Sequence, residues 1–180
     1  GTGMGSSSSY IVGLLNALYA YQGKHVNAEK LAREACQIEI DILKKPIGKQ
    51  DQYIAAYGGF QYVKFNSDDS VYVDPIVCKI ETKKMLEKRL LLFYTGITRS
   101  SAPILAKQTK NMATQTGKRK FMINMVHLAK EMHNALNKNK LDNFGKILHE
   151  NWLLKKQMAE GIKNSQVDKW YKDALKIQMV

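Results

Sequence analysis

Apolar side chains occupy almost every position between Ser8 and Tyr21, where the chain reads Ser-Ser-Tyr-Ile-Val-Gly-Leu-Leu-Asn-Ala-Leu-Tyr-Ala-Tyr. A surface helix carries a wide polar face, and this segment has none. The pattern therefore predicts a helix that is buried in the protein core.

A second helix is predicted from Ala28 to Leu43, with Asn27 as its N-terminal cap. Apolar residues recur in it at alternating intervals of three and four, which is typical of an amphipathic helix. These residues are Ala28, Leu31, Ala35, Ile38 and Ile42. Pro46 and Gly48 interrupt the pattern, and a short helix is expected from Lys49 to Ala56.

From Gly58-Gly59 onward the spacing of apolar residues changes to the alternation that is typical of β-strands. Strands are predicted at Phe60–Asn66 and Val71–Lys79, joined by the turn Asn66-Ser67-Asp68-Asp69. The apolar run Leu90–Tyr94 predicts a buried strand that ends at Gly96. From Ser100 onward the pattern is helical to the end of the chain. The expected fold class is therefore α+β with a largely helical C-terminal part.

Composition and charge narrow the classes of partner. The 28 Lys and Arg outnumber the 16 Asp and Glu, for a formal net charge of +12. The lysines are scattered singly and in pairs, so we interpret most as solvated and a minority as contacts to anionic substrates, and expect no nucleic-acid partner. No apolar run of 18 residues could span a bilayer, and the two cysteines match no metal spacing. We therefore expect a cytoplasmic protein without a membrane partner.

The first nine residues, Gly-Thr-Gly-Met-Gly-Ser-Ser-Ser-Ser, run directly into the first predicted helix. Glycine lets the backbone turn sharply and approach a ligand closely. The first N–H groups of a helix lack intrahelical partners and carry the positive end of the helix dipole, which favours phosphate. Gly and Ser at an N-terminus are equally typical of an expression-tag remnant. From these residues alone both interpretations stay open.

Two carboxylates of the second predicted helix fall on different faces. Asp41 lies on the polar stripe and is expected to be a solvated surface charge. Glu39 aligns with the small residues of the buried face, Ala32, Ala35 and Cys36. A carboxylate there requires a cation or hydrogen-bond donors. Glu39 is therefore either a Mg²⁺ ligand or one half of a buried salt bridge.

Two further residues have both a structural and a chemical interpretation. Asp51 follows the Pro–Gly interruption at the start of a short helix, where it would cap that helix or act as a general base in phosphoryl transfer. Arg99 lies between hydroxyl residues after the predicted strand Leu90–Tyr94. An arginine there suits a phosphate or a sugar acid, although an exposed arginine beside an ordinary helix cap is the simpler interpretation.

Together these blocks resemble the GHMP kinases. Gly3-Met4-Gly5-Ser6-Ser7-Ser8-Ser9 is similar to the family's phosphate loop, Gly-Leu-Gly-Ser-Ser-Ala-Ala. Pro46-Ile47-Gly48-Lys49-Gln50-Asp51-Gln52 is similar to the segment with the catalytic aspartate, which falls on Asp51. The family's Mg²⁺-binding glutamate and serine fall on Glu39 and Ser7.

The resemblance implies ATP and Mg²⁺ as cofactors and assigns roles by position. The ATP phosphates would be bound by Gly3, Met4, Gly5, Ser6, Ser7 and Ser8. Mg²⁺ would be held by Ser7 and Glu39, and Asp51 would be the catalytic base. Arg99 and Gln52 are expected substrate contacts.

Over essentially all 180 residues the chain is most similar to the family's sugar-1-kinase branch, with the D-glycero-D-manno-heptose 7-phosphate kinases as the best fit. This implies ATP-dependent phosphorylation of the anomeric hydroxyl of D-glycero-D-manno-heptose 7-phosphate, giving the 1,7-bisphosphate for nucleotide-activated heptose. A fucokinase or galactokinase, or a non-catalytic sugar- or nucleotide-binding relative, is the alternative.

The implied architecture is a GHMP-kinase-like two-lobe fold that is incomplete at both ends. We expect residues 1–82 to be the C-terminal part of the N-terminal, ATP- and Mg²⁺-binding lobe, and residues 83–180 to be part of the C-terminal lobe. Family members carry further motifs before and after these residues, so we expect this chain alone to be inactive.

Overall fold

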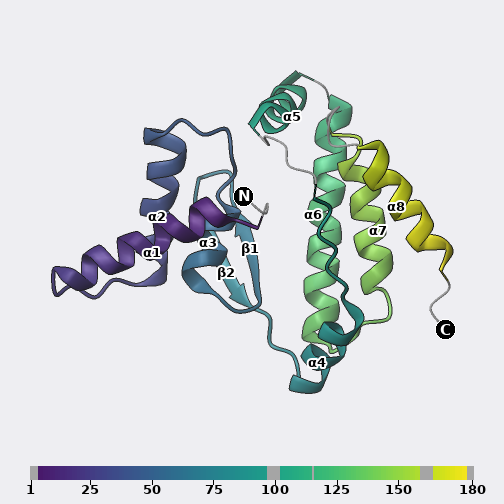
Figure 1. The fold of residues 1–180 in the computed structure, drawn as a ribbon, viewed down its shortest axis with the longest axis horizontal. Helices are drawn as coiled ribbons and strands as arrows, with labels where there is room; N and C mark the ends of the chain where they lie inside the picture. Colours follow the sequence, from purple (N-terminus) through teal and green to yellow (C-terminus); the bar gives the residue numbers. More distant parts are fainter. Residues whose placement is uncertain (1–3, 97–101, 115, 159–163, 178–180) are drawn as a thin grey trace. The chain divides into compact units, whose positions relative to one another are not determined.

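The computed structural model of the 180-residue chain describes residues 4–96, 102–114, 116–158 and 164–177. The fold is α+β and divides into two compact units, Gly1–Val77 and Cys78–Val180. The expected lobe boundary after residue 82 falls inside a helix of the second unit, Ile80–Arg89. Each unit has its own apolar core. Figure 1 labels the helices and strands of the chain.

The N-terminal unit consists of helices followed by one β-hairpin. Its elements are α1 (Ser6–Tyr21), α2 (Ala28–Cys36), the π-helix η1 (Gln37–Ile42), α3 (Gln50–Tyr57), β1 (Gln61–Phe65) and β2 (Val71–Pro75). Asn27 caps α2 by accepting a hydrogen bond from the Lys30 N–H at 2.9 Å, which confirms the expected cap. The hairpin is antiparallel with Val63 opposite Val73, and Asn66 closes its turn through Ser70.

Two apolar clusters hold this unit together. In the first, Val12 of α1 packs against Leu31 and Ala35 of α2. In the second, buried residues of α2 and α3 meet the valines of the hairpin, with members Ala32, Cys36, Tyr53, Val63, Val71 and Val73. The Tyr53 hydroxyl also donates to Glu29 Oε1 at 3.1 Å, so α3 is tied to α2 by a hydrogen bond as well as by packing.

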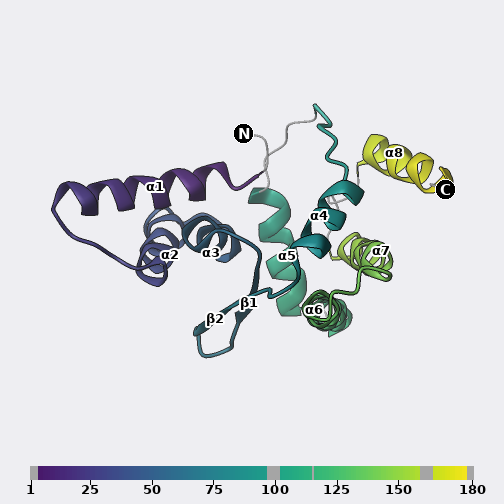
Figure 2. The ribbon, with the colours of Figure 1, turned by 90° about the horizontal axis from the view of Figure 1, so that it is seen from below.

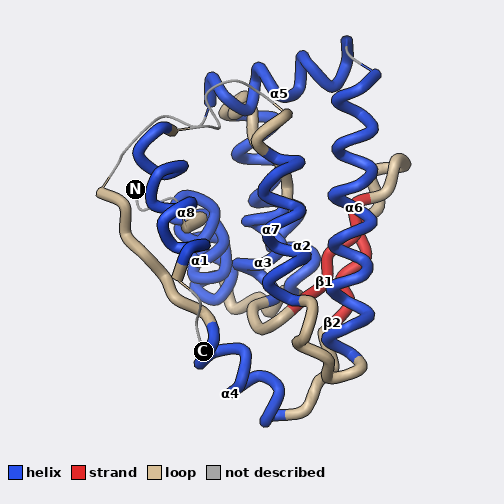
Figure 3. Tube along the Cα trace, turned by 90° about the vertical axis from the view of Figure 1, so that its right-hand side faces the viewer, coloured by secondary structure: helices blue, strands red, loops and turns tan. Residues whose placement is uncertain are grey.

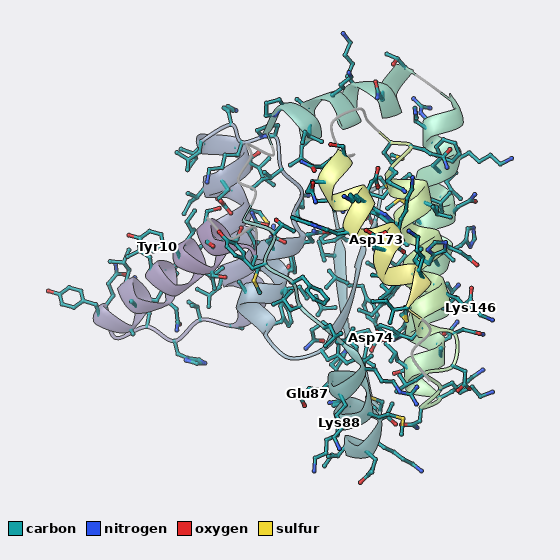
Figure 4. All side chains as sticks on the ribbon, turned by 45° about the vertical axis from the view of Figure 1, so that its right-hand side comes forward. Tyr10, Asp74, Glu87, Lys88, Lys146 and Asp173 are labelled. Atoms are coloured by element: carbon teal, nitrogen blue, oxygen red, sulfur yellow. The ribbon has the colours of Figure 1, made fainter. Side chains whose placement is uncertain are left out.

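The expectation that α1 is buried on all sides is wrong. One face packs on α2 and α3, while Tyr10, Leu14, Leu18 and Tyr21 on other faces are exposed. Figure 4 shows the labelled Tyr10 side chain projecting outward from α1, and 69% of this residue is accessible. Apolar residues all around a helix do not specify which faces have neighbours, and the described residues provide a packed neighbour on one side.

The prediction of one continuous α-helix over residues 28–43 is correct only as far as Cys36. From Gln37 the backbone widens into a π-helix, whose hydrogen bonds span five residues instead of four. The Leu43 N–H accordingly donates to the Ile38 carbonyl at 2.9 Å. Hydrophobic spacing does not distinguish this one-residue insertion from an ordinary helix end.

The C-terminal unit is helical throughout its described elements. They are α4 (Ile80–Arg89), α5 (Ala102–Thr114), α6 (Thr116–Asn137), α7 (Phe144–Lys155) and α8 (Ser165–Lys176). Helices α6 and α7 run side by side (Figure 2), and α8 joins α7 through a 2.7 Å hydrogen bond between His149 Nδ1 and the Tyr171 hydroxyl. Met158 is fully buried against Ile104, Phe121, Met122, Met125 and Trp152.

The predicted buried strand Leu90–Tyr94 is also wrong. The segment is a loop (Figure 3), and exposure of its residues ranges from 51% at Leu90 to 84% at Leu92. A strand requires a partner for its backbone groups, and an apolar run identifies no partner. The second hairpin strand likewise ends at Pro75 rather than Lys79. Within the described ranges, no helix is long and apolar enough to cross a membrane.

Candidate functional site

Glu39 is the centre of the site and is completely inaccessible to solvent. Its two carboxylate oxygens each accept two hydrogen bonds. At Oε1 the donors are the Ser7 hydroxyl at 2.7 Å and the Lys45 ammonium at 2.9 Å. At Oε2 they are the Ser8 hydroxyl at 2.6 Å and the Gln52 amide nitrogen at 2.6 Å. A buried carboxylate with four donors is fully satisfied.

These donors determine the charge state of Glu39. Burial alone would raise the pKa of this carboxyl, because removal from water disfavours the charged form. Hydrogen bonds from Ser8, Lys45, Ser7 and Gln52 outweigh burial and lower the pKa from 4.5 to about 2. Glu39 is therefore a carboxylate at neutral pH, and a permanent negative charge lies inside the N-terminal unit.

The end of the π-helix positions Lys45. Lys44 adopts a left-handed conformation, with φ at 52°, and reverses the chain after Leu43. The Lys45 N–H then donates to the Glu39 carbonyl at 3.0 Å. This closure resembles a Schellman motif but is one residue wider, as the π-helix requires. Lys45 therefore contacts both the backbone and the side chain of Glu39.

Gly5 places the phosphate-loop candidate beside Asp51. Gly5 is the N-terminal cap residue of α1 and has a left-handed backbone with φ at 68°. A β-carbon built on Gly5 would lie 3.5 Å from Asp51 Cγ and 3.6 Å from Asp51 Oδ2. Asp51 lies in the first turn of α3 and is exposed, while Lys49 occupies the cap position. The carboxylate of Asp51 therefore faces the loop instead of capping its own helix.

The start of α1 also offers donors to an anion. The first backbone hydrogen bond of the helix runs from the Ser9 N–H to the Gly5 carbonyl at 2.9 Å. The N–H groups of Ser6, Ser7 and Ser8 precede it, in the turn where a helix supplies no acceptor. With the helix dipole behind them, these groups suit a phosphate oxygen.

The donor set around Glu39 also fits Mg²⁺. No group of three or more His, Cys, Asp or Glu gathers in the described part of the chain. However, Mg²⁺ in kinases typically uses one or two carboxylates with substrate phosphates and water. Here one cation, the Lys45 ammonium, already lies on Glu39 Oε1 beside the Ser7 hydroxyl. Gln52 Oε1 is buried without a donor among the described residues, which leaves a further hard oxygen in the same place.

Apart from Gly5, Asp51 and Gln52, the sequence candidates fall into three groups. Ser7, Ser8 and Glu39 are brought together, and Glu39 is buried while Asp41 is exposed, as the periodicity predicts. Met4 and Ser6 are exposed at the start of α1. Gly3 and Arg99 lie outside the described residues.

Two contacts of the site are absent from the sequence prediction. Gln52, expected as a substrate contact, is fully buried and donates to Glu39. Lys45 is not among the predicted residues, although the Pro46 that follows it marks a chain reversal near Glu39. Glu39 forms an ion pair with Lys45 in which the carboxylate is buried and the lysine side chain is 36% accessible, so only one half of the pair is buried.

Comparison with known proteins finds a family match over the residues that form this site. Residues 1–59 match the family described as "GHMP kinases N terminal domain". The match includes the opening loop, which favours its interpretation as part of the domain over that of an expression-tag remnant. The chain is 28% identical to the D-glycero-alpha-D-manno-heptose 7-phosphate kinase of Campylobacter jejuni, over 97% of this chain and 51% of that protein. It is also 28% identical to the bifunctional fucokinase/GDP-fucose pyrophosphorylase of Arabidopsis thaliana, over 95% of this chain and 16% of that protein.

Two solved structures share the fold at 29% identity. One is a D-glycero-D-manno-heptose 1-phosphate kinase from Bacteroides thetaiotaomicron, with a TM-score of 0.69 over 90% of this chain and 46% of that one. The other is described as a sugar kinase from Campylobacter jejuni, with a TM-score of 0.67 over 96% of this chain and 48% of that one. The chain thus spans about half the length of these kinases. Residues 1–59 thus match the family model of the GHMP kinase N-terminal domain, and the α+β fold is similar to that of two solved sugar kinases.

Proposed function

We propose that this chain is the phosphoryl-transfer part of an ATP-dependent sugar kinase that phosphorylates the anomeric hydroxyl of D-glycero-D-manno-heptose 7-phosphate. The single observation that supports it most is that the left-handed Gly5 faces Asp51, whose side chain would be in contact with a β-carbon at position 5. Asp51, the proposed general base, thus lies near the N-terminus of α1, where phosphate would bind, within one compact unit. Names of the related kinases support the choice of sugar.

In this proposal each part of the site has a task. The loop from Gly3 to Ser8 binds the ATP phosphates through backbone N–H groups. Asp51 accepts the proton of the anomeric hydroxyl at a carboxylate oxygen as the sugar oxygen bonds to the γ-phosphorus and the bond to ADP breaks. Ser7 and Glu39 would hold Mg²⁺, which would supply positive charge to the phosphate oxygens. Arg99 is the proposed contact to the sugar's own phosphate.

We assign residues 1–82 to the ATP- and Mg²⁺-binding N-terminal lobe and residues 83–180 to the C-terminal lobe. The buried charge of Glu39 supports a catalytic over a purely regulatory protein. A non-catalytic binding protein has no need of a carboxylate with four donors, a facing loop and an exposed aspartate in one place.

A substrate panel on the natural full-length protein tests this function. We expect Mg²⁺- and ATP-dependent ADP release with D-glycero-D-manno-heptose 7-phosphate, and a new anomeric phosphate in the ³¹P NMR spectrum of the product. The matched control is the same heptose without its 7-phosphate. Preference for the unphosphorylated sugar would contradict the assignment of the substrate, and absence of ADP release with every sugar would contradict kinase activity.

A fucokinase is the second candidate, because the Arabidopsis fucokinase/GDP-fucose pyrophosphorylase matches 95% of this chain. Fucose and galactose therefore belong in the same panel. A kcat/KM for either sugar that exceeds that for the heptose phosphate would favour this candidate.

A further inference from the structure

The two oxygens of the Glu39 carboxylate lie in different surroundings. Oε2 is held by Ser8, which is 2% accessible, and by Gln52, which is fully buried. Oε1 is held by the exposed Ser7 and by Lys45, whose side chain is 36% accessible. Oε2 is thus the anchored oxygen, and Oε1 is the one that an incoming cation can reach.

All acceptor positions of this carboxylate are already filled. Each oxygen has two lone pairs and accepts two hydrogen bonds, so a metal ion at Oε1 must displace a donor. The Ser7 hydroxyl can rotate and offer its own oxygen to the metal. The Lys45 ammonium has no lone pair to offer and carries a positive charge that repels a divalent cation.

The side-chain ammonium of Lys45 can move away from Glu39 without unfolding the loop. Its backbone is held at both ends, because its N–H donates to the Glu39 carbonyl and its own carbonyl accepts from the Ile47 N–H at 2.9 Å. Its side chain is a flexible stem with a partly accessible ammonium. The side chain can therefore swing away while the residue stays in place.

From this geometry we propose that Lys45 is a positioning residue that neutralises Glu39 in the metal-free protein and is exchanged for the divalent cation at Oε1. The inference rests on the proposed function, in which Glu39 is a Mg²⁺ ligand. The Lys45 ammonium thus competes with the metal ion for Glu39 Oε1 and keeps the buried carboxylate paired until the metal binds. Metal affinity is consequently set in part by the strength of the Lys45–Glu39 pair.

The first test measures Mg²⁺ alone, and Mn²⁺ alone, by calorimetry and by the metal-dependent change in Tm of the full chain. Lys45→Met removes the ammonium and keeps the length of the stem. We expect it to raise metal affinity about tenfold, the factor that corresponds to one charge-assisted hydrogen bond. Its metal-free Tm falls, and the rise in Tm on adding Mg²⁺ exceeds that of the wild type.

Lys44→Met is the matched control, because it removes the same charge from an exposed neighbouring residue. Lys44 has a left-handed backbone, which lysine and methionine adopt at a similar cost. Its metal affinity stays within about twofold of the wild type, as charge screening at an exposed position requires. The exchange is overturned if the metal affinity of Lys45→Met is unchanged or weaker than that of the wild type. If Glu39→Gln still abolishes metal binding in that case, the metal role of Glu39 stands without the exchange. Absence of any Glu39-dependent binding overturns both the exchange and the metal part of the proposed function.

A second measurement uses the wild-type protein and does not depend on how well a variant folds. Acylation of lysine side chains is followed by peptide mass spectrometry with and without Mg²⁺. Exchange predicts that labelling of Lys45 increases several-fold with Mg²⁺, while labelling of Lys44 stays constant. Labelling of Lys45 that is constant or decreases with bound Mg²⁺ contradicts the proposal.

Discussion

Gly5 faces Asp51 across the space of one methyl group, with the glycine in a left-handed conformation and the aspartate in the first turn of α3. The distances from a hypothetical Gly5 β-carbon to Asp51, 3.5 to 3.6 Å, are those of ordinary contacts. Space at this position therefore permits a methyl group. The constraint on residue 5 is its backbone angle, which L-amino acids with a β-carbon adopt at a cost.

Gly5→Ala is expected to lower the free energy of unfolding by about 1–2 kcal/mol, because alanine is strained at a φ of 68°. Urea denaturation measures the change. Gly48→Ala is the matched control, since Gly48 has no positive φ and no atom within 4 Å of its hypothetical β-carbon. That variant is neutral or up to about 1 kcal/mol more stable. Equal effects of the two substitutions would contradict the role of the left-handed backbone.

Asp51→Asn tests the proposed base. We expect kcat to fall about 10²–10⁴-fold, the usual contribution of a general base. The free energy of unfolding changes little, because Asp51 is exposed and makes no hydrogen bond or ion pair with the described residues. Asp41→Asn, the same exchange at an exposed position of η1, leaves kcat within about twofold. A kcat for Asp51→Asn within a few-fold of the wild type would show that another group takes the proton.

The pKa of Glu39 makes stability depend on acid. Its pKa is 4.5 in the unfolded chain and about 2 in the folded protein, so the folded state binds the proton less well. The stabilisation is therefore complete above pH 4.5 and is lost as pH falls toward 2, by about 3 kcal/mol in total. Unfolding in urea at a series of pH values measures it. Glu39→Gln, which lacks the titrating group, loses less stability across the same interval, and parallel curves for both proteins would refute the assignment.

Periodicity was enough to distinguish Glu39 from Asp41, because each position on a helix face has a definite direction relative to the core. The same kind of local rule identified the Asn27 cap and the turn that begins at Asn66. These features depend on residues within a few positions of one another. Local sequence therefore contains the information that they need.

Lys45 could not be predicted in the same way. It lies six residues after Glu39, and an α-helix would direct these two side chains to different faces. The pair forms because the helix widens at Gln37 and the chain reverses at Lys44. Tertiary packing determines both of these backbone conformations. The conformation of Leu90–Tyr94 also depends on tertiary neighbours, because an apolar run does not show whether a partner strand is present.

The two cysteines are expected to differ sharply toward thiol reagents. Cys36 is buried in α2, and burial raises its pKa from 9.0 to about 11 even though Lys49 acts in the opposite direction. Cys78 is partly accessible. At about pH 8 a disulfide reagent should therefore modify Cys78 quickly and Cys36 only as fast as the protein opens, because the thiolate is the reactive form.

Stopped-flow absorbance with Cys36→Ser and Cys78→Ser assigns the two phases. Cys36→Ser should retain only the fast phase and Cys78→Ser only the slow one, and denaturant should make both thiols react alike. The same pKa makes the folded state less stable in alkali, because the unfolded thiol ionises first. That loss begins as pH rises through 9 and continues until the folded thiol titrates near 11. A fast reaction of Cys36 in the native protein would show that α2 is accessible at this position, contrary to its packing against Tyr53.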